Sequence, residues 1–205
     1  MSINSKLLLQ VKLAVAVALS DNEFSDSEIK YIKKWFNNKI IDYPEREKNR
    51  LLKDFNNELS TLKELSEFDE LSLEDVFYEL KDIDDRSFKY EALDLSIEVM
   101  VADSSIHPKE IELIAKVVDQ LDLNYATSKK YIRNQILKMN KPPKSIDIEG
   151  LLNIYPTVSN KDSRKLFRKE LVIWNSATTS TQTDNQRKNA QVMIDIISAA
   201  RERYV

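Results

Sequence analysis

The sequence predicts an all-α fold: a multi-helix orthogonal bundle that contains two repeated helical hairpins, plus a small C-terminal helical domain. A single glycine and five prolines in 205 residues leave almost no turn chemistry for β-hairpins. Apolar residues recur at helical spacing in nearly every segment. Because 42% of the residues are hydrophobic, the chain can fill the core of one large or two small domains.

The first predicted hairpin begins with the nearly continuous apolar run from Leu7 to Leu19, which indicates a buried core helix. This run covers only about two thirds of the roughly 20 residues that a membrane span needs. No small-residue cleavage site follows it and the chain has no cysteine, so we expect a cytoplasmic protein without a membrane span. An amphipathic helix completes the hairpin, with its apolar stripe at Ile29, Ile32, Trp35, Phe36 and Ile40.

Further helices are predicted before residue 140. Their apolar stripes lie at 51–62, 73–80, 88–102, 111–121 and 128–139. Ser72 can N-cap the helix at 73–80, and the helix at 88–102 is strongly apolar, like the first helix of the chain.

The chain contains an internal repeat. An offset of 82 residues places the hairpin at 5–40 in register with the hairpin at 88–122. Helical periodicity alone would align apolar residues, but it would not align acids. The aligned pairs are Leu13 with Leu95, Val15 with Ile97, Val17 with Val99, Asp21 with Asp103, Glu28 with Glu110, Ile29 with Ile111, Ile32 with Ile114 and Lys34 with Lys116. We interpret the unit as a duplicated helical hairpin.

A break in helical structure is predicted at Asn140–Ser145, which contains two adjacent prolines. We therefore expect a linker at 141–148 between a domain at 1–140 and a domain at 149–205. In the second domain, an amphipathic helix from about Lys161 to Trp174 precedes a polar loop at 175–184 and a last helix at about 185–204.

Each repeated hairpin turns through an acidic loop, and helix capping accounts for part of each loop. Ser25 and Glu28 have the spacing of a capping box. In the second loop, His107 occupies the cap, Pro108 the first helical position and Glu110 the third. The glutamates need no ligand in this interpretation.

Capping leaves two aspartates unexplained. Asp21 and Asp103 each follow an apolar helix, at the end where the macrodipole disfavours a carboxylate by a few tenths of a kcal/mol. Together with Glu23, Glu28, Glu110 and helix-end carbonyls, they would form oxygen-rich pockets suited to a hard divalent cation, calcium or magnesium. The spacing is not that of an EF-hand. Capping alone and cation binding are both open interpretations.

At these loops the chain resembles the TerB family of tellurite-resistance-associated helical domains. In that family a helix rich in alanine and valine ends in an Ala-Asp-Gly type turn, with a glutamate a few residues later, and the pattern occurs twice. The first copy here reads Ala-Leu-Ser-Asp21-Asn-Glu23-Phe-Ser-Asp-Ser-Glu28, and the second reads Val-Ala-Asp103-Ser-Ser-Ile-His-Pro-Lys-Glu110. The resemblance covers roughly residues 5–125.

The TerB resemblance implies an all-helical domain whose clustered acids bind divalent metal, found in bacterial stress and defence assemblies, including phage defence, rather than in metabolic enzymes. The chain departs from the family pattern where Asn22 and Ser104 replace the glycine after each aspartate. Asparagine tolerates a left-handed turn better than serine does, which makes the first loop the stronger candidate.

The C-terminal segment resembles a degenerate J-domain, the chaperone-stimulating module of some proteins that also carry a TerB-like region. The similarity rests on Leu151-Leu-Asn-Ile-Tyr-Pro, the basic helix and the final Ile196-Ile-Ser-Ala-Ala-Arg201. The loop at 175–184 lacks the His-Pro-Asp triplet that engages the partner ATPase, so we expect no chaperone stimulation.

The basic helix offers a possible partner-binding face. Lys161, Arg164, Lys165 and Arg168 are spaced three and four residues apart and share one side of the helix. The face can simply be solvated, it can dock a protein, or it can bind nucleic acid, which the scarcity of interleaved aromatic residues disfavours.

Charge divides the chain near Tyr125. Residues 1–125 hold 27 acidic and 16 basic side chains, a balance of −11, and residues 126–205 hold 7 acidic and 15 basic, a balance of +8. Docking between the halves, an acidic partner for the second half and two solvated surfaces are all compatible with this division.

Catalytic motifs are missing from the sequence: there is one histidine, no cysteine, no Gly-rich phosphate loop and no nucleophile elbow. We therefore expect a non-catalytic TerB-like adaptor that docks a protein partner in a bacterial stress or defence assembly and uses divalent cations. The alternative is a J-domain-related co-chaperone or client-binding module, and the third hypothesis is a cryptic metal-dependent enzyme.

Overall fold

The computed structural model describes residues 3–21, 24–67, 73–180 and 183–204. Within these ranges the chain forms ten α-helices and one short 3-10 helix, and no strand. The all-α prediction is confirmed. No helix in the described part of the chain is long and apolar enough to cross a membrane.

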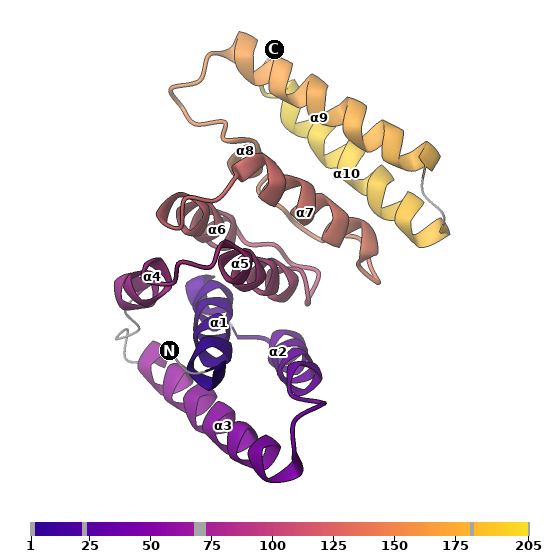
Figure 1. Cartoon of the computed structure of the whole chain (residues 1–205). Coiled ribbons are helices and arrows are strands. Elements are labelled where there is room, and N and C mark those ends of the chain that lie inside the picture. Colours follow the sequence, from indigo (N-terminus) through magenta and orange to yellow (C-terminus); the bar gives the residue numbers. More distant parts are fainter. Residues whose placement is uncertain (1–2, 22–23, 68–72, 181–182, 205) are drawn as a thin grey trace.

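The elements in chain order are α1 (Ile3–Ala18), η1 (Leu19–Asp21), α2 (Asp26–Lys39), α3 (Glu45–Glu67), α4 (Leu73–Lys81), α5 (Arg86–Met100), α6 (Pro108–Gln120), α7 (Tyr125–Lys138), α8 (Ile148–Leu152), α9 (Asn160–Ser180) and α10 (Asp184–Glu202). Figure 1 shows them stacked from α3 at one end of the molecule to the α9–α10 hairpin at the other. Ser72, the predicted N-cap of α4, lies outside the described residues.

Two apolar cores meet at α1 and α5. The main core joins these helices to α4 and to α6 through α10. The α3 core joins them to α2 and α3. α1 directs Leu9, Leu13 and Val17 into the main core and Val11, Val15 and Ala18 into the α3 core. This explains why α1 is apolar on nearly all sides and why α5 has buried apolar residues on two faces, because both helices contact both cores.

The two repeated hairpins pack against each other through their first helices, α1 and α5. Gln10 Nε2 donates to the Phe88 carbonyl oxygen, and Lys6 Nζ lies 5.4 Å from the centre of the Phe88 ring. These contacts join residues 78 and 82 positions apart, close to the repeat offset, so equivalent parts of α1 and α5 face each other. α2 packs on α5 and α6 packs on α1. The second helix of each hairpin therefore packs against the first helix of the other hairpin.

The C-terminal hairpin, formed by α9 and α10, packs on α7 and α8. Most of this contact is made by α10. Phe167 and Trp174 belong to the main core, which is therefore continuous across the segment predicted as a linker. The helix predicted to end at Trp174 instead continues to Ser180, so the polar loop predicted at 175–184 is wrong over its first six residues. The division into two domains stays a prediction.

A buried ion pair fixes α9 to α7. Arg133 Nε and Nη2 donate to the two carboxylate oxygens of Glu170 at 2.5 and 2.6 Å, and Trp174 Nε1 donates to the same carboxylate at 3.0 Å. Glu170 is 2% exposed. With three donors, the carboxylate is compensated for its loss of water.

We expect Glu170→Gln to lower the free energy of unfolding by about 3 kcal/mol, because it leaves the half-buried Arg133 guanidinium without its counter-charge. Urea denaturation followed by circular dichroism measures the change. Lys165→Ala, which removes the exposed Lys165–Asp162 pair from the same helix, is the control and should leave the midpoint unchanged. Equal midpoints for wild type and Glu170→Gln would contradict the structural role of the pair.

Candidate functional site

The first acidic loop joins α1 to α2 through η1. Its capping box is formed as predicted: Ser25 N donates to Glu28 Oε2 at 2.7 Å, and Glu28 N donates to Ser25 Oγ at 3.2 Å. Glu28 is 5% exposed, so this candidate cation ligand is engaged at the start of α2. The Asp21 side chain and Glu23 lie outside what the structure describes.

Ser20 adds a feature to the first loop that the sequence did not single out. Its hydroxyl oxygen is buried and has no hydrogen-bond partner among the described residues. It lies in η1 directly before Asp21. A buried hydroxyl without a partner commonly marks a place where a water or an ion completes the structure.

The second loop has the same capping box with different residues. His107 N donates to Glu110 Oε2 at 2.7 Å, and Lys109 N donates to His107 Nδ1 at 3.2 Å. Pro108 occupies the first turn of α6, and Glu110 is 2% exposed. The single histidine is therefore a helix cap in this structure.

Asp103 has a structural role that the sequence did not reveal. Its Oδ1 accepts a hydrogen bond from Ser105 N at 2.7 Å, closing a turn around Ser104. Ser104 adopts φ 70°, the left-handed conformation for which the TerB pattern carries glycine. The carboxylate thus stabilises a strained turn, which accounts for an acid at this helix end without a ligand.

The segment after α7 holds the second loop in place. Lys144 N donates to the Ser104 carbonyl at 2.9 Å, and Ile106 N donates to the Ser145 carbonyl at 3.3 Å, forming an isolated parallel bridge. The predicted linker therefore lies along the second loop. Among the described residues, no group of three or more His, Asp or Glu side chains is arranged to hold a metal ion.

A polar cluster on α5 was not predicted from the sequence. Glu98 accepts hydrogen bonds from the Tyr31 hydroxyl at 2.8 Å, the Tyr131 hydroxyl at 2.7 Å and Gln135 Nε2 at 3.4 Å, so it links α5 to both α2 and α7. Burial and the Glu98 carboxylate raise the pKa of both tyrosines, which therefore stay neutral donors. Burial, followed by the charges of Glu98 and Glu91, raises the pKa of Asp94 to about 6.

This cluster carried a signal in the sequence. Glu91, Asp94 and Glu98 recur at intervals of three and four residues in a helix that is otherwise apolar, so they share one face. An acidic stripe on a core helix indicates that donors from neighbouring helices meet it.

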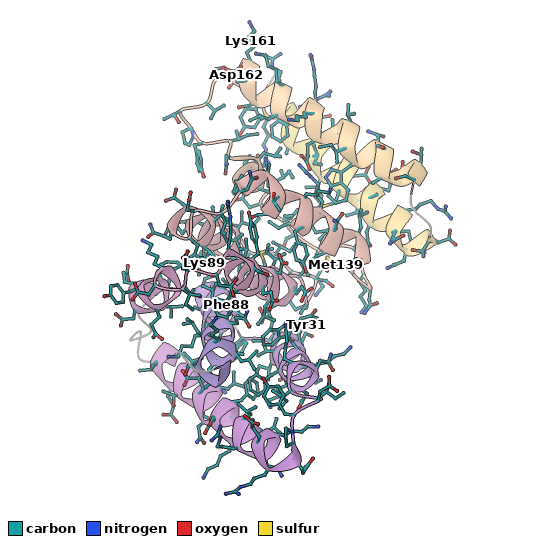
Figure 2. All side chains as sticks on the ribbon, viewed as in Figure 1. Tyr31, Phe88, Lys89, Met139, Lys161 and Asp162 are labelled. Atoms are coloured by element: carbon teal, nitrogen blue, oxygen red, sulfur yellow. The ribbon has the colours of Figure 1, made fainter. Side chains whose placement is uncertain are left out.

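The predicted partner-binding residues all lie on α9. Lys161, Arg164, Lys165 and Arg168 are exposed, and Figure 2 shows Lys161 and Asp162 at the outer end of the helix. Lys165 Nζ pairs with Asp162 at 2.9 Å, and this contact lowers the pKa of the Asp162 carboxyl. In the part of the chain that the structure describes, the other three side chains form no ion pair.

Comparison with known proteins gives one family. The family model described as tellurite resistance protein TerB matches residues 8–131, more than half of the chain, including most of both hairpins. Searches of curated proteins and of solved structures found no match. The match does not extend to α8, α9 or α10, so the J-domain resemblance stays a prediction.

Ser104→Gly should stabilise the protein by about 1 kcal/mol, because glycine adopts the left-handed conformation without the steric cost that serine carries. Ser105→Gly, one residue later, is the matched control. Ser105 does not have a positive φ, so its replacement should instead destabilise by about 0.5–1 kcal/mol through backbone entropy. Thermal and urea unfolding of the three proteins give the comparison, and a loss of stability in Ser104→Gly would be inconsistent with the turn.

Proposed function

Because the chain belongs to the TerB family, we propose that it is a non-catalytic adaptor that docks a protein partner through α9 in a bacterial stress or defence assembly related to tellurite resistance. The observation that carries the proposal is the exposed basic face of Lys161, Arg164 and Arg168, which has no acidic partner among the described residues. A charged face that folding does not neutralise is available to a complementary surface.

The setting of this face supports a binding role. Glu170 and Trp174 lie further along α9 and hold it against α7, so the basic residues are presented on a fixed helix. A fixed helix loses little conformational entropy when a partner binds.

Reversing the charge of this face should abolish the recovery of partner proteins with the tagged protein. The variant Lys161→Glu, Arg164→Glu, Arg168→Glu is compared with Arg46→Glu, Arg50→Glu, Lys53→Glu, which makes the same charge change on exposed residues of α3, at the other end of the molecule. Each tagged protein is produced in bacterial cells, with and without tellurite, and crosslinked there to the proteins it contacts. The proteins that are recovered with it are quantified by mass spectrometry. We expect the α3 variant to recover the wild-type set and the α9 variant to lose it.

Two further outcomes would favour a different docking face or the co-chaperone alternative. Equal recovery by both variants would reject α9 as the docking face. Stimulation of a partner chaperone's ATP hydrolysis by the purified protein would instead support the J-domain-related co-chaperone.

We further propose that the adaptor binds a divalent cation, calcium or magnesium, at the first loop. The supporting observation is the buried Ser20 hydroxyl without a described partner, next to Asp21. A hydroxyl, a carboxylate and helix-end carbonyls are hard oxygen ligands. At the second loop, Asp103 is engaged by Ser105 N, which leaves the first copy as the better candidate.

Isothermal titration calorimetry with calcium and magnesium tests this proposal. Asp21→Asn should remove the heat of binding, whereas Asp103→Asn, its equivalent in the second repeat, should keep it. At one hundred times the dissociation constant, the cation should stabilise the wild-type protein by about 2.7 kcal/mol. Identical heats in wild type and Asp21→Asn would reject the site.

A further inference from the structure

A pocket of about 390 Å³ lies between α2, the C-terminal end of α5 and α7. Its volume is in the range of sites that bind small ligands or a few side chains of a partner. Ser27, Lys30 and Lys34 line it from α2, and Lys138 lines it from α7. Two of its lining residues, Tyr31 and Met139, are labelled in Figure 2.

The internal repeat provides a comparison for this pocket. Adding 82 to the residue numbers on α2 gives Lys109, Glu112 and Lys116 on α6, and these three also line a pocket, which α6 forms with α8. In the second copy Glu112 pairs with Lys116 at 2.9 Å. The two copies thus line a pocket with the same helix face. Only in the second copy does a glutamate of that face, Glu112, pair with its lysine, Lys116.

The first copy has a lysine where the second has its glutamate. Lys30 and Lys34 are like charges one helical turn apart, an arrangement that costs a few tenths of a kcal/mol in an isolated helix. No carboxylate among the described residues pairs with Lys30, Lys34 or Lys138. Three lysines therefore line one pocket, and two of them, Lys30 and Lys34, lie in the part of the chain that carries a net charge of −11.

The pocket's own acid offsets only part of these positive charges. Glu98 is the carboxylate among its described lining residues, and its two oxygens accept from the Tyr31 and Tyr131 hydroxyls. Because neither Glu98 nor another described carboxylate forms an ion pair with the three lysines, the lysines can pair with a ligand. A bound carboxylate would relieve the repulsion between Lys30 and Lys34.

The remaining wall is apolar. Val101, Ala102 and Met139 line the pocket beside the lysines. Methionine adapts its shape to different apolar side chains. The surface therefore combines anion-binding groups with an apolar contact, a combination suited to a peptide segment that carries both acidic and aliphatic residues.

We propose that this pocket binds an acidic segment of a protein partner, with an aspartate or glutamate of that segment paired to Lys30 and Lys34, and an aliphatic neighbour packed on Val101 and Met139. A nucleic acid is a poorer occupant, because Tyr31 is the one aromatic residue among the described lining residues and its hydroxyl is engaged by Glu98, so the pocket offers little for bases to stack on. The site is separate from the basic face of α9 and does not depend on it.

The probe is a short fluorescein-labelled peptide in which a central leucine is flanked by aspartate and glutamate. Its neutral twin has asparagine and glutamine at those positions. Fluorescence anisotropy measures binding to the full chain, and NMR amide shifts locate it. We expect the acidic peptide to bind, its twin to bind at least about tenfold more weakly, and the shifts to gather at Ser27, Tyr31, Ala102 and Gln135.

Lys30→Glu gives the first repeat the charge arrangement of the second, so it should weaken the acidic peptide by about tenfold or more. Lys138→Glu should weaken it as well, from the opposite side of the pocket. Lys33→Glu is the matched control. It makes the same change in charge at an exposed residue of α2 that does not line the pocket.

Three results would overturn the site. They are equal weakening by Lys33→Glu and Lys30→Glu, amide shifts centred on α9 rather than on the pocket, and tighter binding of inorganic phosphate or a single-stranded RNA oligonucleotide at the same residues. Since the α9 charge-reversal variant keeps this pocket, its binding of the acidic peptide separates failure here from failure of the proposed adaptor face.

Discussion

The packing of α1 against α5 is the constraint on which the rest of the fold depends. Both helices belong to the main core and to the α3 core at once, so most of their described side chains are buried, and charged residues such as Lys12 and Glu98 lie where the cores leave the helix partly exposed. Two of their buried polar side chains donate within the pair: Gln10 Nε2 donates to the Phe88 carbonyl, and the Ser96 hydroxyl donates to the Ala92 carbonyl. Burying such groups without partners would cost far more than the hydrogen bonds contribute.

This packing also decides where the loops lie. Because α2 packs on α5 and α6 packs on α1, each hairpin covers the apolar helix of the other. Neither hairpin could bury its apolar helix alone, which is why duplication, rather than extension of one hairpin, completes the core. The capping boxes at Ser25 and His107 then start the covering helices at equivalent places.

Sequence patterns predicted those features that depend on neighbours in the chain. The apolar periodicity and both capping boxes involve residues within a turn or two of each other, and the structure contains them. The end of α9 was not predicted, because Asn175 and Thr178 are typical loop residues. In the structure their side chains donate to the helix carbonyls of Leu171 and Asn175, so these polar groups find partners inside the helix rather than ending it.

The candidate site was less predictable because its contacts come from distant segments. Glu98 meets Tyr31 and Tyr131, which lie 67 and 33 residues away, and no local pattern fixes such a meeting. The turn at Asp103 depends on Ser104 adopting a conformation that serine disfavours, and on the later segment at 144–145 that pairs with it. The sequence located the acids but did not reveal what their carboxylates bind.

The division of charge near Tyr125 shows which surfaces folding leaves available. Each ion pair between residues that the structure describes joins partners on the same side of Tyr125, as Lys12–Glu58 and Arg133–Glu170 do. The two parts of the chain are instead joined by the apolar main core and by neutral donors to Glu98. Attraction between an acidic and a basic half therefore does not hold this fold together. Lys161, Arg164 and Arg168 of α9, and the three lysines that line the pocket between α2, α5 and α7, form no ion pair with a described residue, so their charges can select a partner by complementarity.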